Sequence, residues 1–168
     1  NGGSESAQYY ISAGYYGEVG LFKRDNVQTY NSTLRVDRFN FTSNVDVNIT
    51  KTTKLAFGIN GFITNLNRPA YGVNDIFALA TASAPHIIPP QYSNGLWPQL
   101  PGTLQSPYMA LTQSGVTNAY NNTVRSNLRV TQELNRLVDG LSATGMFAFD
   151  VNINNNLTRG RTLQTYYA

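Results

Sequence analysis

Residues 38–49 read RFNFTSNVDVNI and separate into two columns with a period of two. The odd positions are mostly apolar, and the even positions are all polar. Because successive side chains of a β-strand point to opposite faces of a sheet, this alternation predicts a strand with one apolar and one hydrophilic face. The pattern resumes over residues 54–64 after the short link 50–53, so the two runs predict a hairpin.

A second hairpin is predicted farther along the chain. Alternation runs over residues 120–134 and again over residues 141–154, and the turn signal Asp139-Gly140 lies between the two runs. A fifth strand is predicted over residues 8–16, where the pattern is weaker because the pairs Tyr9-Tyr10 and Tyr15-Tyr16 put aromatic rings on both faces.

The length of these runs decides between two kinds of β protein. Strands of globular proteins usually have about five or six residues, whereas strands that span a membrane need roughly 9 to 11. The polar columns consist of Asn, Thr, Ser and Arg with few Lys or Glu, which is typical of a water-filled barrel lumen. We therefore expect an all-β fold, an antiparallel sheet of about five long strands that is a partial segment of a large transmembrane β-barrel. A soluble β-sandwich also has alternating strands and remains the alternative.

The composition excludes several classes of function. Of the 168 residues only 12% are charged, and the formal net charge is +3, while Asn (20) and Thr (17) are abundant. No basic run exceeds Lys23-Arg24, so we expect no nucleic-acid partner. The absence of Cys excludes disulfides, a thiolate nucleophile and Cys-based metal sites. No apolar run reaches about 18 residues, so no transmembrane helix is expected.

Most of the region between the two hairpins carries no charge. From Ile76 to Val124, 49 residues contain no Asp, Glu, Lys or Arg, and six of the seven prolines lie there. Asn74-Asp75 is expected to cap a short helix, which the prolines then end. The two long connections, 17–37 and 65–115, alternate with short turns, as the loops on the two rims of a membrane barrel do.

Two groups of side chains in these segments are candidate site residues. The aromatic residues Tyr92, Trp97 and Tyr108 are expected to lie in the long uncharged loop, where they could stack on a neutral substrate or contact a lid. Packing of the loop onto itself is the other interpretation of these rings. The arginines of the polar columns are expected to face the lumen, either guiding substrate or forming a solvated wall; they are Arg38, Arg125 and Arg129.

Residues for catalysis or metal binding are not recognisable. His86 is the single histidine, and no carboxylate lies within ten residues of it. No Gly-x-Ser-x-Gly motif occurs, and the aspartate spacings are ordinary for strands and turns. We therefore expect no enzyme, no metal and no cofactor.

Several short motifs recur in order along nearly the whole chain: residues 15–24 (YYGEVGLFKR), 38–46 with 49–51, Asn67-Arg68-Pro69, Pro107-Tyr108-Met109-Ala110-Leu111, Gln132-Glu133-Leu134, Gly140-Leu141-Ser142 and Phe147-Ala148-Phe149-Asp150. Taken together and in this order, they resemble the barrel region of the SusC/RagA family of TonB-dependent outer-membrane transporters.

This resemblance implies import of oligosaccharides or peptides across the outer membrane of a Gram-negative bacterium related to Bacteroides. It also implies four partners: the rest of the barrel with its plug domain, a SusD-like surface lipoprotein, the TonB complex acting through a missing N-terminal region, and outer-membrane lipid. A secreted β-sandwich that binds carbohydrate is the alternative function.

The same resemblance implies the domain organisation. Residues 1–168 are expected to be one segment of a barrel domain without the plug, with hairpins at about 38–64 and 118–154 and a long extracellular-type loop at about 65–116. Membrane barrels begin at eight strands, so five strands cannot close. We expect the chain to be an internal piece of a longer protein.

Overall fold

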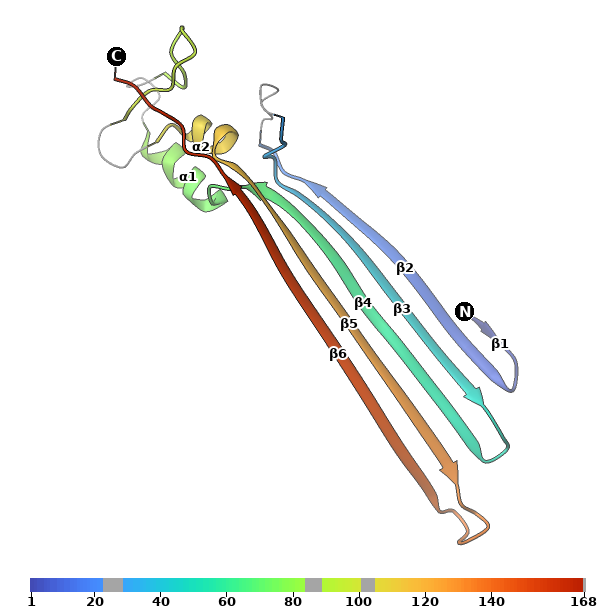
Figure 1. Cartoon of the computed structure of the whole chain (residues 1–168). Coiled ribbons are helices and arrows are strands. Elements are labelled where there is room, and N and C mark those ends of the chain that lie inside the picture. The colour runs from blue at the N-terminus through green and yellow to red at the C-terminus, as the bar shows by residue number, and fades with distance from the viewer. Residues whose placement is uncertain (23–28, 84–88, 101–104, 168) are drawn as a thin grey trace. The chain divides into compact units, whose positions relative to one another are not determined.

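The computed structural model describes residues 1–22, 29–83, 89–100 and 105–167 and shows one antiparallel sheet with two short helices (Figure 1). The strands follow the sequence order β1-β2-β3-β4-β5-β6, so β1 and β6 form the two edges of an open sheet. This confirms the predicted all-β fold. The elements are β1 Gly2–Gly3, β2 Ala7–Val19, β3 Arg35–Asn48, β4 Thr53–Pro69, α1 Val73–Ala82, α2 Pro107–Gln113, β5 Gly115–Glu133 and β6 Ser142–Gly160.

The five main strands are longer than their hydrophobic alternation indicates. They have 13, 14, 17, 19 and 19 residues in chain order. The last residues of β4 are mostly polar, and the side-chain amide of Asn67 donates to the carbonyl oxygens of Asn31 (2.9 Å) and Thr33 (2.8 Å). Backbone pairing does not need an apolar side chain, so a strand can continue past the end of its alternating pattern.

Both short turns form where the sequence predicts them. Gly140 has a φ of +78°, the left-handed conformation that glycine adopts without strain, and its N–H donates to the side-chain oxygen of Asn135 (3.1 Å). At the other turn the hydroxyl of Thr50 accepts from the N–H of Thr52 (3.2 Å). The Thr50 contact is of the kind in which a turn side chain bonds to the backbone two residues on.

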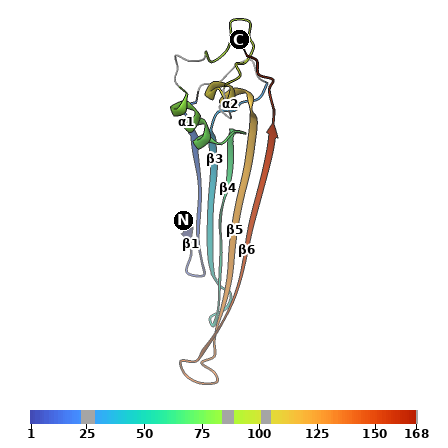
Figure 2. The same ribbon diagram turned by 90° about the vertical axis from the view of Figure 1, so that its left-hand side faces the viewer.

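The chain divides into two compact units, each of which has its own internal contacts. The strand unit comprises residues 1–16, 37–64 and 120–154, and the helix unit comprises residues 17–36, 65–119 and 155–168. The strand unit is a single layer of strands, as the turned view in Figure 2 shows. Only Gly58 and Thr123 are buried in it, so this unit has no apolar core of its own.

The helix unit, in contrast, has a small core between its two helices. Ile76 and Leu79 of α1 pack with Ala110 and Leu111 of α2, and all four are at most 9% exposed. Partly buried Tyr71 packs against this cluster. The two helices thus bury their apolar faces on each other.

The helix ends differ in part from expectation. Helix α1 forms where predicted, but Gly72 is its N-cap and no side-chain cap bond is made, so the capping role assigned to Asn74 and Asp75 is wrong. Asp75 instead lies in the first turn, where its negative charge complements the helix dipole. Neither helix in the described part of the chain is long and apolar enough to cross a bilayer.

Helix α2 lies in a segment that the sequence pattern predicted to be loop. The hydroxyl of Ser106 accepts the N–H of Met109 (3.4 Å), and Pro107 occupies the first helical turn. A serine N-cap followed by proline is a recognised helix start. This pair of residues was the signal that could have identified the helix.

Gly115 and Gly140 provide a matched test of the backbone geometry. Both have positive φ, but a Cβ on Gly115 would collide with the carbonyl oxygen of Arg159, whereas a Cβ on Gly140 would meet nothing within 4 Å. Gly140→Ala should therefore cost only the left-handed strain of about 1–2 kcal/mol, and Gly115→Ala should cost more. Amide hydrogen exchange should increase strongly around Arg159 in Gly115→Ala. Equal local destabilisation by the two substitutions would contradict the close approach.

Candidate functional site

The apolar columns of neighbouring strands lie on one face of the sheet in the strand unit. The rings of Tyr15 on β2 and Phe39 on β3 have centroids 5.0 Å apart. On the same face, a Cβ built on Gly61 of β4 would come within 2.9 Å of the Phe41 ring of β3. The odd positions of β2, β3 and β4 therefore share this face.

The polar columns are joined in the same way on the opposite face. A Cβ on Gly58 would approach the side-chain amides of Asn127 on β5 and Asn44 on β3. Thr131 of β5 and Thr144 of β6 have hydroxyl oxygens 3.3 Å apart. Because successive side chains of a strand alternate between the two faces, the even positions of β5 and the odd positions of β6 belong to the apolar face.

The apolar face is almost free of charge and is exposed. Along the strands of the strand unit, Asp37 is its one charged residue, and the carboxylate of Asp37 accepts a hydrogen bond from the Tyr15 hydroxyl (2.5 Å). Phe147 is 67% exposed and Ile11 is 65% exposed. A contiguous exposed apolar patch of this kind marks a surface that contacts a membrane or a partner. Large exposed residues on this face are Tyr9, Ile11, Tyr15, Phe39, Phe57, Ile63, Tyr120, Val130, Phe147, Phe149 and Ile153.

The three arginines singled out from the sequence lie on the polar face, each beside a different neighbour. The guanidinium of Arg38 lies 4.1 Å from the ring centroid of Phe62. Arg125 lies 4.0 Å from the carboxylate of Asp150, and Arg129 lies 3.9 Å from the sulfur of Met146. Strand β4 separates Arg38 on β3 from the other two arginines on β5.

Sequence reasoning missed Phe62 as the partner of Arg38. Phe62 belongs to the polar column of β4, and an aromatic ring there breaks the alternation. A cation over an aromatic face is attracted by the ring quadrupole, and the Nε–H of Arg38 also donates to Asn40 (2.9 Å). Together these contacts hold the Arg38 side chain against the sheet.

The aromatic candidates belong to the helix unit, and two of the three are in contact. The rings of Trp97 and Tyr108 have centroids 6.1 Å apart with an interplanar angle of 36°. Tyr108 lies on α2 and not in a loop. Tyr92 lies in a separate turn, where its N–H donates to the carbonyl of Leu96 (3.0 Å) and its carbonyl accepts from Gly95 (2.9 Å).

Groups for metal binding are absent from the described part of the chain, which contains no cluster of three His, Cys, Asp or Glu residues that could hold an ion. His86 lies outside the described residues. The candidate functional groups are therefore the apolar and polar faces of the strand unit and the neutral aromatic pair of Trp97 and Tyr108 in the helix unit.

Comparison with known proteins relates the chain to one class of receptor. It is 28% identical over 158 residues to TonB-dependent receptor P3 from Formosa agariphila. The similarity covers 89% of this chain but 14% of that protein, so the chain spans about one seventh of its relative. No family model matches the sequence, and no solved structure matches it. The chain is thus similar to a short part of a TonB-dependent receptor that is named as a receptor and not as an enzyme.

The exposed ion pair between Arg125 and Asp150 should contribute little to stability. Both side chains are about two-thirds exposed (65% and 68%), and exposed pairs are typically worth about 0.2–1 kcal/mol. A double-mutant cycle with Arg125→Gln and Asp150→Asn, followed by denaturant unfolding of the full-length protein, should give a coupling free energy within this range. A coupling of several kcal/mol would show instead that the pair lies in a dry, enclosed environment.

Proposed function

We propose that this chain is part of the membrane-spanning β-barrel of a TonB-dependent outer-membrane transporter for nutrient uptake. The observation that supports this function is the apolar face of the strand unit, which is exposed over five strands and carries Asp37 as its one charge. Lipid tails would cover such a face without any further protein layer. The opposite, polar face would then line the aqueous lumen.

Strand length agrees with this proposal. Crossing the hydrocarbon core takes roughly 9 to 11 tilted residues per strand, and β4 has 17 residues while β5 and β6 each have 19. Strands of this length would cross the bilayer and extend beyond it. A soluble β-sandwich would need a second sheet over the apolar face, and the described residues form one sheet.

The finer assignment rests on resemblance to the SusC/RagA family. It would make the full protein an importer of oligosaccharides or peptides in the outer membrane of a Gram-negative bacterium. A SusD-like lipoprotein would act as its partner, and the TonB complex would supply energy. Residues 1–168 would then form one segment of the barrel domain, and residues outside the segment would supply the plug and the strands that close the barrel.

Two sets of side chains take roles within this proposal. Arg38, Arg125 and Arg129 would face the lumen, since they share the polar face. The rings of Tyr92, Trp97 and Tyr108 would contact the substrate or the lid from the helix unit. Their neutral surroundings favour this role, because the segment from Ile76 to Val124 has no charged residue.

A lysine scan of the two faces tests the membrane assignment directly. Phe147→Lys and Val45→Lys place a charge on the apolar face and should each cost about 2–4 kcal/mol if the site lies near the bilayer midplane. The adjacent polar-face substitutions Ala148→Lys and Asn44→Lys are matched controls and should cost much less. The measurement is reversible denaturant unfolding of the full-length protein in lipid vesicles. If both faces tolerate lysine equally, the apolar face does not contact lipid.

The aromatic residues can be tested through substrate affinity in the full-length transporter. Trp97→Ala and Tyr92→Ala remove rings proposed to contact substrate, and the loss of stacking on these rings should make binding at least several-fold weaker. Phe149→Ala, which removes an exposed ring from the apolar face of the strand unit, is the control. Unchanged affinity in both loop variants would assign these rings to packing alone.

A further inference from the structure

The turn between β5 and β6 carries two adjacent apolar side chains at its tip. Leu137 is 75% exposed and Val138 is 60% exposed. Arg136 precedes the pair and Asp139 follows it, so a charged residue lies on each side. Neighbouring branched apolar side chains at an exposed tip are unfavourable in water, and they mark a surface that another phase or molecule covers.

The fold of the turn does not need these two side chains. Backbone bonds close it, since the N–H of Leu134 donates to the carbonyl of Leu141 (2.8 Å) and the N–H of Leu137 donates to the carbonyl of Leu134 (2.8 Å). The side chain of Asn135 completes the turn through its bond with the N–H of Gly140 (3.1 Å). The apolar character of the tip is therefore not explained by the turn itself.

The β3–β4 turn of the same unit is polar throughout. Residues 50–53 are Thr, Lys, Thr and Thr, and the hydroxyl of Thr50 donates to the hydroxyl of Thr53 (2.8 Å). Such a turn is suited to water and to lipid headgroups. Of these two turns, only the β5–β6 turn has apolar residues at its tip.

The turns of the strand unit reach progressively farther along the strands (Figure 1). The N–H of Asn48 donates to the carbonyl of Ser6 (2.8 Å), so the turn before β2 ends short of the β3–β4 turn. The N–H of Glu133 donates to the carbonyl of Thr52 (2.7 Å), so the β5–β6 turn extends beyond the β3–β4 turn. Strands tilted by about 35–45° show this stagger when their turns lie at one membrane surface.

The apolar surface of the turn continues that of the sheet. Leu134 follows the even positions of β5, and Leu141 precedes the odd positions of β6. Both sets of positions belong to the apolar face. Lipid that covers the apolar face would therefore meet this turn next, and a protein partner would have to displace that lipid.

We propose that residues 136–139 are a membrane-interface contact of the barrel. Leu137 and Val138 enter the boundary between the lipid headgroups and the acyl chains, as the apolar residues of interfacial segments do. The guanidinium of Arg136 lies level with the lipid phosphates, and its methylene stem covers apolar surface. The proposal rests on the proposed function, because it takes the apolar face to be covered by lipid.

Spin labelling of the full-length protein in phosphatidylcholine vesicles tests this contact. Residues 1–168 contain no Cys, and any cysteines elsewhere are first replaced by serine, so each variant carries one nitroxide. Collision rates with oxygen, which concentrates in lipid, and with a water-soluble nickel chelate give the depth of each label. Labels on Leu137→Cys and Val138→Cys should lie about 5–10 Å below the lipid phosphates. Lys51→Cys is the matched control, since the same label on the polar turn should lie level with the phosphates or above them.

Two results would overturn the proposal. Labels at 137 and 138 that meet the nickel chelate as often as the label at 51 would place the tip in water, and labels shielded from both reagents would mean that protein covers it. Phe147→Cys, on the apolar face, separates these failures from failure of the transport proposal, because its label should be the deepest. If that label is also open to the nickel chelate, the transport proposal itself is rejected. Heat-modifiable gel migration, which reports an assembled barrel, is measured for every variant.

Discussion

Backbone pairing between adjacent long strands is the interaction on which the strand unit depends. Each strand from β2 to β5 has a hydrogen-bonded neighbour on both sides, whereas side-chain burial contributes little, since Gly58 and Thr123 are the buried residues of that unit. A two-faced sheet in water normally gains its stability by burying one face. The strand unit has such an apolar face, but no other part of the unit covers it. The stability of the sheet therefore depends on the medium or the protein that lies against this face.

The helix unit is stabilised in a different way. Ile76, Leu79, Ala110 and Leu111 bury one another in a small core, and capping at Ser106 fixes the start of α2. This core joins the two short helices through buried apolar side chains. The two units thus differ in what stabilises them: backbone pairing in the strand unit and side-chain burial in the helix unit.

The sequence predicts the strand faces well because alternation with a period of two is a direct consequence of strand geometry. It predicts strand ends poorly: β4 continues to Pro69 because pairing with neighbours does not depend on whether Asn65 or Asn67 is apolar. Helix α2 was missed because it has only seven residues, too few for a helical period to emerge. The Arg38–Phe62 contact was missed because it requires the register between two strands, which a single strand's pattern does not contain.

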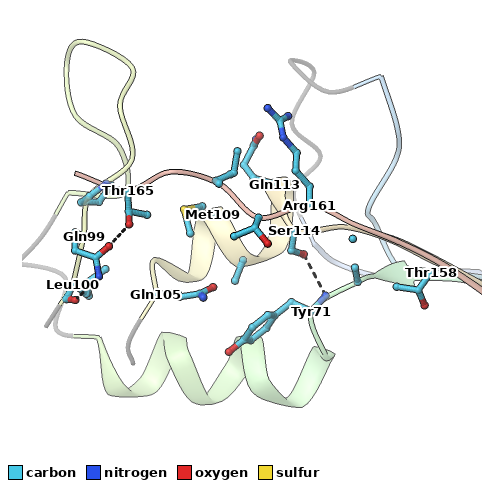
Figure 3. A pocket seen from close by; sticks show the side chains of 16 residues that line it. Tyr71, Gln99, Leu100, Gln105, Met109, Gln113, Ser114, Thr158, Arg161 and Thr165 are labelled. Atoms are coloured by element: carbon cyan, nitrogen blue, oxygen red, sulfur yellow. Dashed lines mark hydrogen bonds between the residues drawn. The ribbon is translucent and has the colours of Figure 1, made fainter. Parts of the chain in front are cut away.

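The scarcity of charge has a common physical cause in both units. Along the strands of the strand unit, every charged residue except Asp37 lies on the polar face, so half of the strand positions are closed to charge and the total stays low. In the helix unit, Gln99 and Thr165 are hydrogen-bonded although they are 66 positions apart in the chain (Figure 3). A charged side chain at either position would replace this neutral hydrogen bond by a charge whose desolvation costs free energy unless it is paired. Neutral hydrogen-bonding groups therefore serve where charge would be costly, both beside an apolar surface and between the packed segments of the helix unit.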